Sequence, residues 1–295
     1  MSTVARTRTL LSERPATALV APLLLFDLLI FVAPFGYLLR MSLSGRRTAQ
    51  AYAEGTWSVA GYQYLLAPSN TLLSVLGFTF AFAAVVTTLS VLVATLYAHA
   101  MWRADGTVRV ALIAGALVSM FTAIVVKLFA AVLVFSPDGV LNAALVGSGL
   151  LPEPIRLVNN AAGAVIGQLY IVVPYSVLAV YSVLATVDES LLEAARDLGA
   201  SGPRAFREVV VPHAVPGMLV AGVISFTWSV GSYAAPLLLG SGSERTAGIA
   251  VSDLLLREFD WPSAAALAVV VTSAVVVALI VTRVTLSRSG VDVDA

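Results

Sequence analysis

Six long apolar segments constrain the fold of this chain more than any other feature of its sequence. A helix needs about 20 predominantly apolar residues to cross a hydrocarbon core about 30 Å thick. Hydrophobic residues make up 59% of the chain and charged residues 12%, whereas soluble domains are about 45–50% apolar and about 25% charged. We therefore predict an all-α membrane protein with six transmembrane helices, at residues 19–39, 71–101, 108–135, 161–187, 218–240 and 263–285.

The arginine positions predict how these helices are oriented. The first apolar segment is longer than the core of about 7–15 residues in a cleaved signal peptide, so we expect it to be retained. Cytoplasmic loops carry an excess of Lys and Arg. We therefore predict that both termini are cytoplasmic, together with the connection between the fourth and fifth helices. This orientation places ten arginines inside (Arg6, Arg8, Arg14, Arg103, Arg109, Arg196, Arg204, Arg207, Arg283, Arg288) and six outside (Arg40, Arg46, Arg47, Arg156, Arg245, Arg257).

The composition argues against several classes of function. The formal net charge is zero, which gives no sign of nucleic-acid binding, and the absence of cysteine excludes disulfides and thiolate metal sites. The two histidines, His99 and His213, are far apart in the sequence, so we expect no metal site. The single lysine, Lys127, follows two valines and cannot belong to the Gly-Lys-Ser/Thr of a phosphate-binding loop. We predict no catalytic residue and no cofactor in this chain.

The connection between the fourth and fifth predicted helices is hydrophilic and reads EAARDLGASGPRAFREVVVP at residues 193–212. A connection that only joins two spans needs a few turn residues, whereas this one is charged and helix-forming. Asp188 or Thr186 is placed to cap a helix start. Gly199 stands where a helix end favours a left-handed residue. The pattern predicts a short helix followed by a sharp turn.

A second short helix is predicted after this turn. Pro203 suits the first position of a helix, and we expect Pro212 and Pro216 to end it before the fifth span. The resulting helix-turn-helix indicates a docking surface for a soluble partner. The alternative is an amphipathic helix that lies on the bilayer surface.

The spacing of this segment resembles that of a known family. Glu-Ala-Ala at residues 193–195 is followed after three residues by Gly199, after nine more by Val209, and then by Val211 and Pro212. This pattern resembles the cytoplasmic EAA loop in permease subunits of binding-protein-dependent ABC importers of type I. Val209 and Val211 replace the usual Ile and Leu, a conservative departure that we expect to leave docking unaffected.

The resemblance continues beyond this loop, over about residues 71–283. SFTWSVGSYAAPLLLG at residues 225–240 and FDWPSAAALAVV at residues 259–270 resemble the polyamine and opine branch of these permeases, which includes spermidine/putrescine permeases. The resemblance implies a type I importer permease fold with a cytoplasmic coupling helix, located in the bacterial plasma (inner) membrane.

The family resemblance also implies an organisation and a set of partners. Residues 1–70 would form the N-terminal tail, first helix and external loop, residues 71–285 the core with its EAA loop at 188–216, and residues 286–295 a cytoplasmic tail. The partners would be an ABC ATPase dimer that hydrolyses ATP, a second permease that is a different chain, an extracytoplasmic solute-binding protein and membrane lipid. The residues expected to dock the ATPase are Glu193, Ala194, Ala195, Arg196, Asp197, Leu198, Gly199, Arg204, Arg207 and Pro212.

Polar and aromatic side chains within the spans are candidates for a substrate pathway. Ser225, Trp228, Ser229 and Ser232 recur at spacings of three and four residues, so we expect them to share a helix face. Aromatic faces attract cations, although small and hydroxyl residues also serve ordinary helix packing. The full set of pathway candidates is Gln168, Tyr170, Tyr175, Ser225, Trp228, Ser229, Ser232 and Tyr233.

Two charged residues, Asp27 and Lys127, fall inside the predicted spans. A charge at the middle of a bilayer costs about 2.5–3.5 kcal/mol on insertion scales. The two residues could pair, or either could face a water-filled pathway. Snorkelling of Lys127 and a helix–helix hydrogen bond from Asp27 are the structural alternatives.

The leading hypothesis is a permease subunit for a small solute, with spermidine, putrescine or a related cation as the expected substrate. A permease of the same family for another small solute is one alternative. An ion-coupled secondary transporter is another, but it needs coupling acids in the spans, and only Asp27 qualifies. The third is a membrane scaffold that recruits a soluble protein without solute flux.

Overall fold

The computed structural model describes residues 14–47, 50–67, 72–188 and 190–288, and Arg6, Arg8 and the end of the predicted C-terminal tail lie outside this part. Its helices and strands are, in chain order, α2 (Arg14–Asp27), the π-helix η1 (Leu28–Val32), α3 (Ala33–Ser42), β1 (Gly45–Arg47), β2 (Gln50–Ala53), α4 (Ala60–Leu66), α5 (Leu72–Arg103), α6 (Gly106–Phe121), α7 (Ile124–Phe135), α8 (Val140–Gly147), α9 (Ala161–Leu184), α10 (Ser190–Asp197), α11 (Gly202–Ala205), the π-helix η2 (Phe206–Val210), α12 (Val211–Val230), α13 (Ala234–Leu239), α14 (Ala247–Leu256) and α15 (Trp261–Arg288).

Six helical stretches of the described chain are long and apolar enough to cross a membrane, which agrees with the predicted number. Four of them coincide closely with predicted segments, since a run of apolar residues of this length has few other stable environments. The third and fifth differ in extent, and the third consists of two helices, α7 and α8, joined at residues 136–139. The six stretches are Pro22–Ser42, Leu73–Arg103, Ile124–Gly147, Ala161–Leu184, Gly202–Val230 and Trp261–Arg283.

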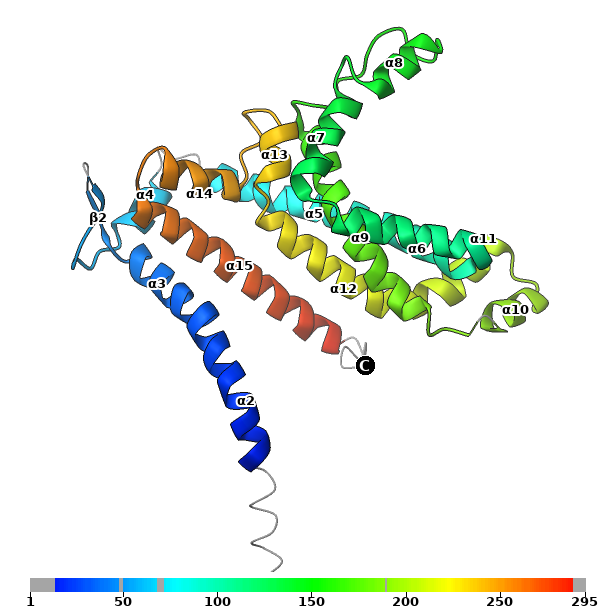
Figure 1. The fold of residues 1–295 in the computed structure, drawn as a ribbon, viewed down its shortest axis with the longest axis horizontal. Helices are drawn as coiled ribbons and strands as arrows, with labels where there is room; N and C mark the ends of the chain where they lie inside the picture. The colour runs from blue at the N-terminus through cyan, green and yellow to red at the C-terminus, as the bar shows by residue number, and fades with distance from the viewer. Residues whose placement is uncertain (1–13, 48–49, 68–71, 189, 289–295) are drawn as a thin grey trace, which may run out of the picture. The chain divides into compact units, whose positions relative to one another are not determined.

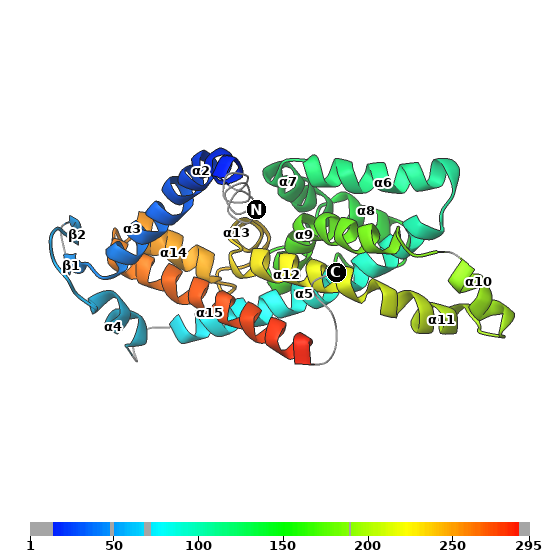
Figure 2. The same ribbon diagram turned by 90° about the horizontal axis from the view of Figure 1, so that it is seen from below.

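The third predicted span, residues 108–135, is not one helix. Thr122 and Ala123 adopt extended backbone conformations between α6 and α7, and the Thr122 hydroxyl donates to the Val118 carbonyl at 2.6 Å. Hydropathy does not register such a break, because apolar residues continue on both sides of it. α5 ends at Arg103, and α6 turns back after a short connection, so these two helices form a hairpin (Figure 2).

Contacts between Cα atoms divide the chain into two compact units, residues 1–67 with 254–270 and residues 68–253 with 271–295. In the second unit, α5, α9 and α12 pack side by side (Figure 1). Many of their buried residues are alanines, and such small residues allow close helix packing. Two buried apolar clusters result. One contains residues of α5, α9, α12 and the connection between α9 and α12, and the other contains residues of α5, α7, α9 and α13.

The first unit contains a short antiparallel hairpin, in which Gly45 pairs with Ala53. Asp260 precedes α15 and caps it, since its Oδ1 accepts a hydrogen bond from the Ser263 backbone N–H at 3.3 Å. The other carboxylate oxygen of Asp260 lies 2.6 Å from an Arg46 guanidinium nitrogen. The Asp260 carboxylate and the Arg46 guanidinium thus form an ion pair, although their geometry is not that of a hydrogen bond. The hairpin is therefore held to the start of α15.

Candidate functional site

The hydrophilic segment from Asp188 to Pro212, which we call the docking segment, begins with a capped helix. The Asp188 side chain accepts a hydrogen bond from the Ser190 backbone N–H at 2.9 Å. This bond and one from the Ser190 hydroxyl hold the pKa of Asp188 below its usual range. The amphipathic helix α10 follows. Of the two predicted capping residues, Asp188 therefore caps α10, whereas the Thr186 hydroxyl donates back to the Val183 carbonyl.

The end of α10 is a tight left-handed turn at Gly199, as the sequence predicts. Gly199 has a φ of +89°, a conformation in which a residue with a Cβ is strained. Its backbone N–H donates to the Arg196 carbonyl at 2.8 Å, and the Ala200 N–H donates to the Ala195 carbonyl at 3.0 Å. These two bonds form a Schellman motif, which satisfies carbonyls at the helix end and fixes the direction of the turn.

The second helix of the docking segment does not end before the fifth span, contrary to the prediction from Pro212 and Pro216. The helix runs without interruption from Gly202 to Val230. Pro212 lies in the first turn of α12, directly after the π-helical turn η2. Pro lacks the N–H that an interior helix position donates, and such local π adjustments commonly accommodate it in membrane helices. Pro216 lies within α12.

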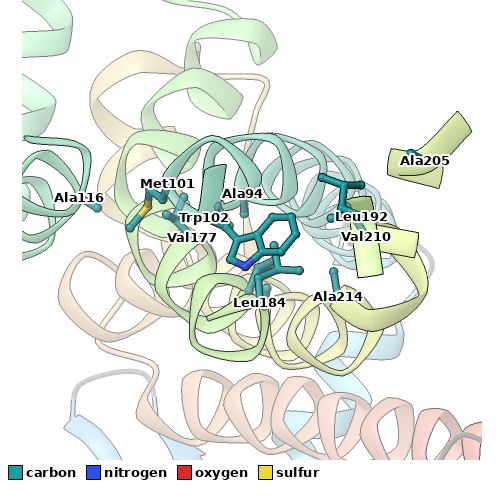
Figure 3. Close-up of a cluster of buried hydrophobic side chains, with 13 residues drawn as sticks. Ala94, Met101, Trp102, Ala116, Val177, Leu184, Leu192, Ala205, Val210 and Ala214 are labelled. Atoms are coloured by element: carbon teal, nitrogen blue, oxygen red, sulfur yellow. The ribbon is translucent and has the colours of Figure 1, made fainter. Parts of the chain in front are cut away.

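One side of the docking segment is buried against the spans. Leu192 of α10, Ala205 of α11 and Val210 of η2 belong to the same buried cluster as residues of α5 and α9. Figure 3 shows Leu192 and Val210 around the Trp102 ring of α5.

The opposite side of the docking segment is open. Of the predicted docking residues, Ala195 is half-buried, and the others are exposed: Glu193, Ala194, Arg196, Asp197, Leu198, Gly199, Arg204, Arg207 and Pro212. Leu198, at the turn, is 90% exposed.

The predicted pathway residues separate into a buried group and an exposed group. Ser225 and Ser229, which lie four residues apart on α12, are fully buried, whereas Trp228 is 37% exposed. Ser232 and Tyr233 are not part of the same helix, because α12 ends at Val230 and α13 begins at Ala234. The prediction that one helix face carries Ser225, Trp228, Ser229 and Ser232 is therefore wrong. It assumed that the helix continued past Gly231.

Three serines from three spans form a closed set of hydrogen bonds. The Ser176 hydroxyl of α9 lies 2.8 Å from that of Ser90 on α5 and 2.8 Å from that of Ser225 on α12, and the Ser225 hydroxyl donates to Ser90 at 3.0 Å. All three side chains are fully buried. Ser90 and Ser176 were not predicted as site residues, and the only signal was a hydroxyl within an apolar segment.

Gln168 of α9 extends this polar contact toward the end of α12. Its side-chain oxygen accepts a hydrogen bond from the Ser232 hydroxyl at 2.6 Å, and its nitrogen donates to the Ser229 hydroxyl at 3.5 Å. Gln168 is 1% exposed, so it joins helices and does not line an open surface.

The aromatic candidates have more exposed surface. Tyr170 is 49% exposed and Tyr233 42% exposed. The rings of Tyr175 on α9 and Trp228 on α12 lie against each other, with centroids 4.9 Å apart and planes inclined by 40°. This pair offers aromatic faces, which attract cations. Tyr170 also lines an apolar cavity of about 340 Å³ between α5, α6 and α9.

The two intramembrane charges have different surroundings. Asp27 is exposed and directly precedes the π-helical turn η1. Lys127 lies in α7 and is 4% exposed. They belong to different compact units, so their pairing stays a prediction.

Residues 155–288 match the family described as the binding-protein-dependent transport system inner membrane component. The matched range includes α9, the entire docking segment and α12 to α15. This part of the chain, a little under half of its length, is similar to that permease family. The finding agrees with the resemblance of the Glu193 segment, and the six apolar spans make the chain a multi-pass inner membrane protein.

Curated relatives are similar to about half of the chain. The spermidine/putrescine transport system permease protein PotB of Haemophilus influenzae is 32% identical over 134 residues, which are 45% of this chain and 47% of that protein. The sulfate transport system permease protein CysT of Salmonella typhimurium is 30% identical over 146 residues, 49% of this chain and 53% of that protein. The chain thus spans about half the length of the curated relatives it matches.

The fold is similar to that of a solved permease over nearly the whole chain. A chain in the crystal structure of a bacterial ABC transporter that imports the acidic polysaccharide alginate aligns with a TM-score of 0.73 and 15% identity. The alignment covers 96% of this chain and 99% of that one. This similarity confirms the type I importer permease fold that the sequence predicts.

Proposed function

We propose that the chain is the transmembrane permease subunit of an ATP-driven ABC importer. The observation that carries this proposal is the turn at Gly199, which presents the 90% exposed Leu198 on a segment anchored to the spans. A connection that only joins two spans needs a few turn residues, whereas this one is a capped helix and turn packed on one side against the spans. The exposed face from Glu193 to Arg207 would enter a cleft on the ATPase, and ATP hydrolysis would take place on that separate chain.

The complete importer would need further partners. We propose an ABC ATPase dimer on the cytoplasmic side, a second permease that is a different chain, and an extracytoplasmic binding protein that delivers the solute. The arginine distribution supports cytoplasmic termini and a cytoplasmic docking segment. In a second solved structure with a similar fold, at a TM-score of 0.75 and 16% identity, a bacterial alginate ABC transporter is in complex with a periplasmic protein that holds an alginate pentasaccharide.

For the substrate, we propose spermidine, putrescine or a related small cation. PotB proteins are prominent among the relatives, and the contact between Tyr175 and Trp228 provides aromatic surface for a cation. Tyr170 and Tyr233 are exposed enough to join such a pathway. The buried Gln168 and the buried serines would support the pathway by holding its helices. Another small solute is the alternative, because a sulfate permease is also among the relatives.

The docking proposal is tested with a matched pair of substitutions. Gly199→Asp and Gly202→Asp add the same charge three residues apart, and a Cβ at either position would meet open space. Only Gly199 has a positive φ, so only its substitution strains the turn. We expect Gly199→Asp to abolish ATP-driven uptake and copurification of the ATPase while membrane insertion stays intact, and Gly202→Asp to retain all three.

The outcomes of this test separate the functions considered. Normal uptake by Gly199→Asp would refute the docking proposal. Uptake that survives ATP depletion and collapses with an ion gradient would identify an ion-coupled transporter, and partner binding without flux would identify a scaffold. Titration of the copurified binding protein with spermidine, putrescine and sulfate then decides the substrate. Tight binding of sulfate alone would overturn the polyamine proposal.

A further inference from the structure

The end of α5 contacts the chain just before the docking segment. Trp102, in the last turn of α5, is 4% exposed and belongs to the buried cluster that includes Leu192 and Leu184 (Figure 3). Its indole N–H donates to the Val187 carbonyl at 3.4 Å. Val187 immediately precedes Asp188, the cap of α10. The entry to the docking segment is therefore tied to α5 by a hydrogen bond as well as by packing.

The same turn of α5 also contacts the second half of the docking segment. The His99 ring meets the Phe206 ring edge to face, with centroids 4.8 Å apart and planes inclined by 63°. The Trp102 ring also lies beside the His99 ring, with centroids 5.9 Å apart. Phe206 is the first residue of η2 and follows α11 directly. Two aromatic residues of α5, Trp102 and His99, therefore pack against residues on the two sides of the Gly199 turn.

The position of Trp102 is itself fixed from α6. The Arg109 guanidinium donates to the Trp102 carbonyl at 3.1 Å and to the Ala104 carbonyl at 2.6 Å. These carbonyls are at the C-terminal end of α5, where backbone acceptors lack helical partners and a cation is favourable. His99 and Trp102 therefore lie in the last turns of a helix whose C-terminal end is capped by Arg109.

We infer that Trp102 and His99 are positioning residues that clamp the two sides of the docking segment onto α5. Force applied to the exposed turn is then transmitted to α5 as well as along the chain into α9 and α12. This inference rests on the proposed function, because it assigns the clamp to the coupling of ATP hydrolysis to solute movement. Its geometric part, a fixed distance between the turn and α5, can be tested in the permease alone.

The distance is measurable because the chain has no cysteine. We would place spin labels at Leu198→Cys on the turn and Leu96→Cys on α5, which are 90% and 62% exposed, and record the distance distribution in the full chain. We expect a narrow distribution for the parent, a broad one for His99→Ala, and a narrow one for His99→Phe, which restores a ring. The exposed His213 provides the matched control, and His213→Ala should leave the distribution narrow.

The functional part is measured in the reconstituted complex as solute transported per ATP hydrolysed. We expect this ratio to fall several-fold in His99→Ala and to recover in His99→Phe. In Trp102→Phe, which keeps an aromatic ring but loses the hydrogen bond to Val187 and part of the buried ring surface, we expect a smaller fall. A role in stability alone would lower yield without changing the ratio. An unchanged distance distribution in His99→Ala refutes the clamp, and a broadened distribution with an unchanged ratio refutes its role in coupling. If the parent complex shows no ATP-driven uptake, the proposed function fails while the distance result still decides the clamp.

Discussion

The close packing of α9 against α12 depends on Gly217. A Cβ added at this position would lie 2.9 Å from the Ala179 carbonyl oxygen and 2.9 Å from the Val180 Cα. Both are backbone atoms, so no side-chain rotation relieves the contact. Ordinary contact begins at about 3.4 Å, so Gly217→Ala must separate the two helices locally by about 0.5 Å, a gap that forfeits a quarter or more of the dispersion energy between the separated atoms.

The expected cost follows from a comparison with a second glycine on the same helix. Overpacking of this kind costs about 1–3 kcal/mol, whereas replacing an interior helical glycine by alanine gains about 0.5–1 kcal/mol. At Gly222, a Cβ would meet the nearest atoms at 3.9 Å, so Gly222→Ala keeps the gain without the clash. Because the propensity gain is common to both substitutions, the difference between them isolates the overpacking, and we expect Gly217→Ala to be less stable by about 1–3 kcal/mol.

The assay is reversible unfolding in mixed micelles with increasing SDS, followed by circular dichroism. The difference in unfolding free energy between Gly217→Ala and Gly222→Ala is the quantity of interest, and the parent chain is the reference. Equal stability of the two variants would contradict the reasoning, because it would mean that α9 and α12 are not in close contact at Gly217.

Two further predictions concern single polar groups. Ser176→Ala removes two hydrogen bonds of the serine set and should lower the unfolding free energy by about 1 kcal/mol, at about 0.6 kcal/mol for each interhelical bond; Ser182→Ala, an exposed position on the same helix, should have no effect in the same SDS titration. Since the pKa of Asp188 is below its ordinary value of 3.8, its carboxylate stabilises α10 above that pH, and the stabilisation is lost as the pH falls through the lower folded value. Amide hydrogen exchange in α10, corrected for its intrinsic pH dependence, should accelerate over that range in the parent and show no such step in Asp188→Asn.

The sequence was most informative where one physical requirement dominates. Apolar length determines which segments cross a bilayer, so the spans were predictable in number and four of the six were predictable in position. The turn at Gly199 was predictable because a positive φ favours glycine over every other residue. The capping by Asp188 followed from the same kind of local rule.

The sequence was least informative where the backbone departs from regular helix without a change of hydropathy. The break at Thr122 and the end of α12 at Val230 both lie among apolar or small residues. Pro212 misled the prediction in the opposite direction, because the π-helical turn η2 lets the helix continue through it. The contact between His99 and Phe206 joins residues more than 100 positions apart, and no local rule reports such a pair.

The uninterrupted helix from Gly202 to Val230 has a mechanical consequence. Its 29 residues make a rod about 43 Å long at about 1.5 Å per residue. A tilt of about 5° at one end of such a rod displaces the other end by about 4 Å, which approaches the pitch of one helical turn, about 5.4 Å. Had Pro212 and Pro216 ended the second helix of the docking segment, a flexible joint would have absorbed that motion. Because they do not, the residues around Arg204 and those around Ser229 belong to one continuous helix, and no loop separates the docking segment from the fifth span.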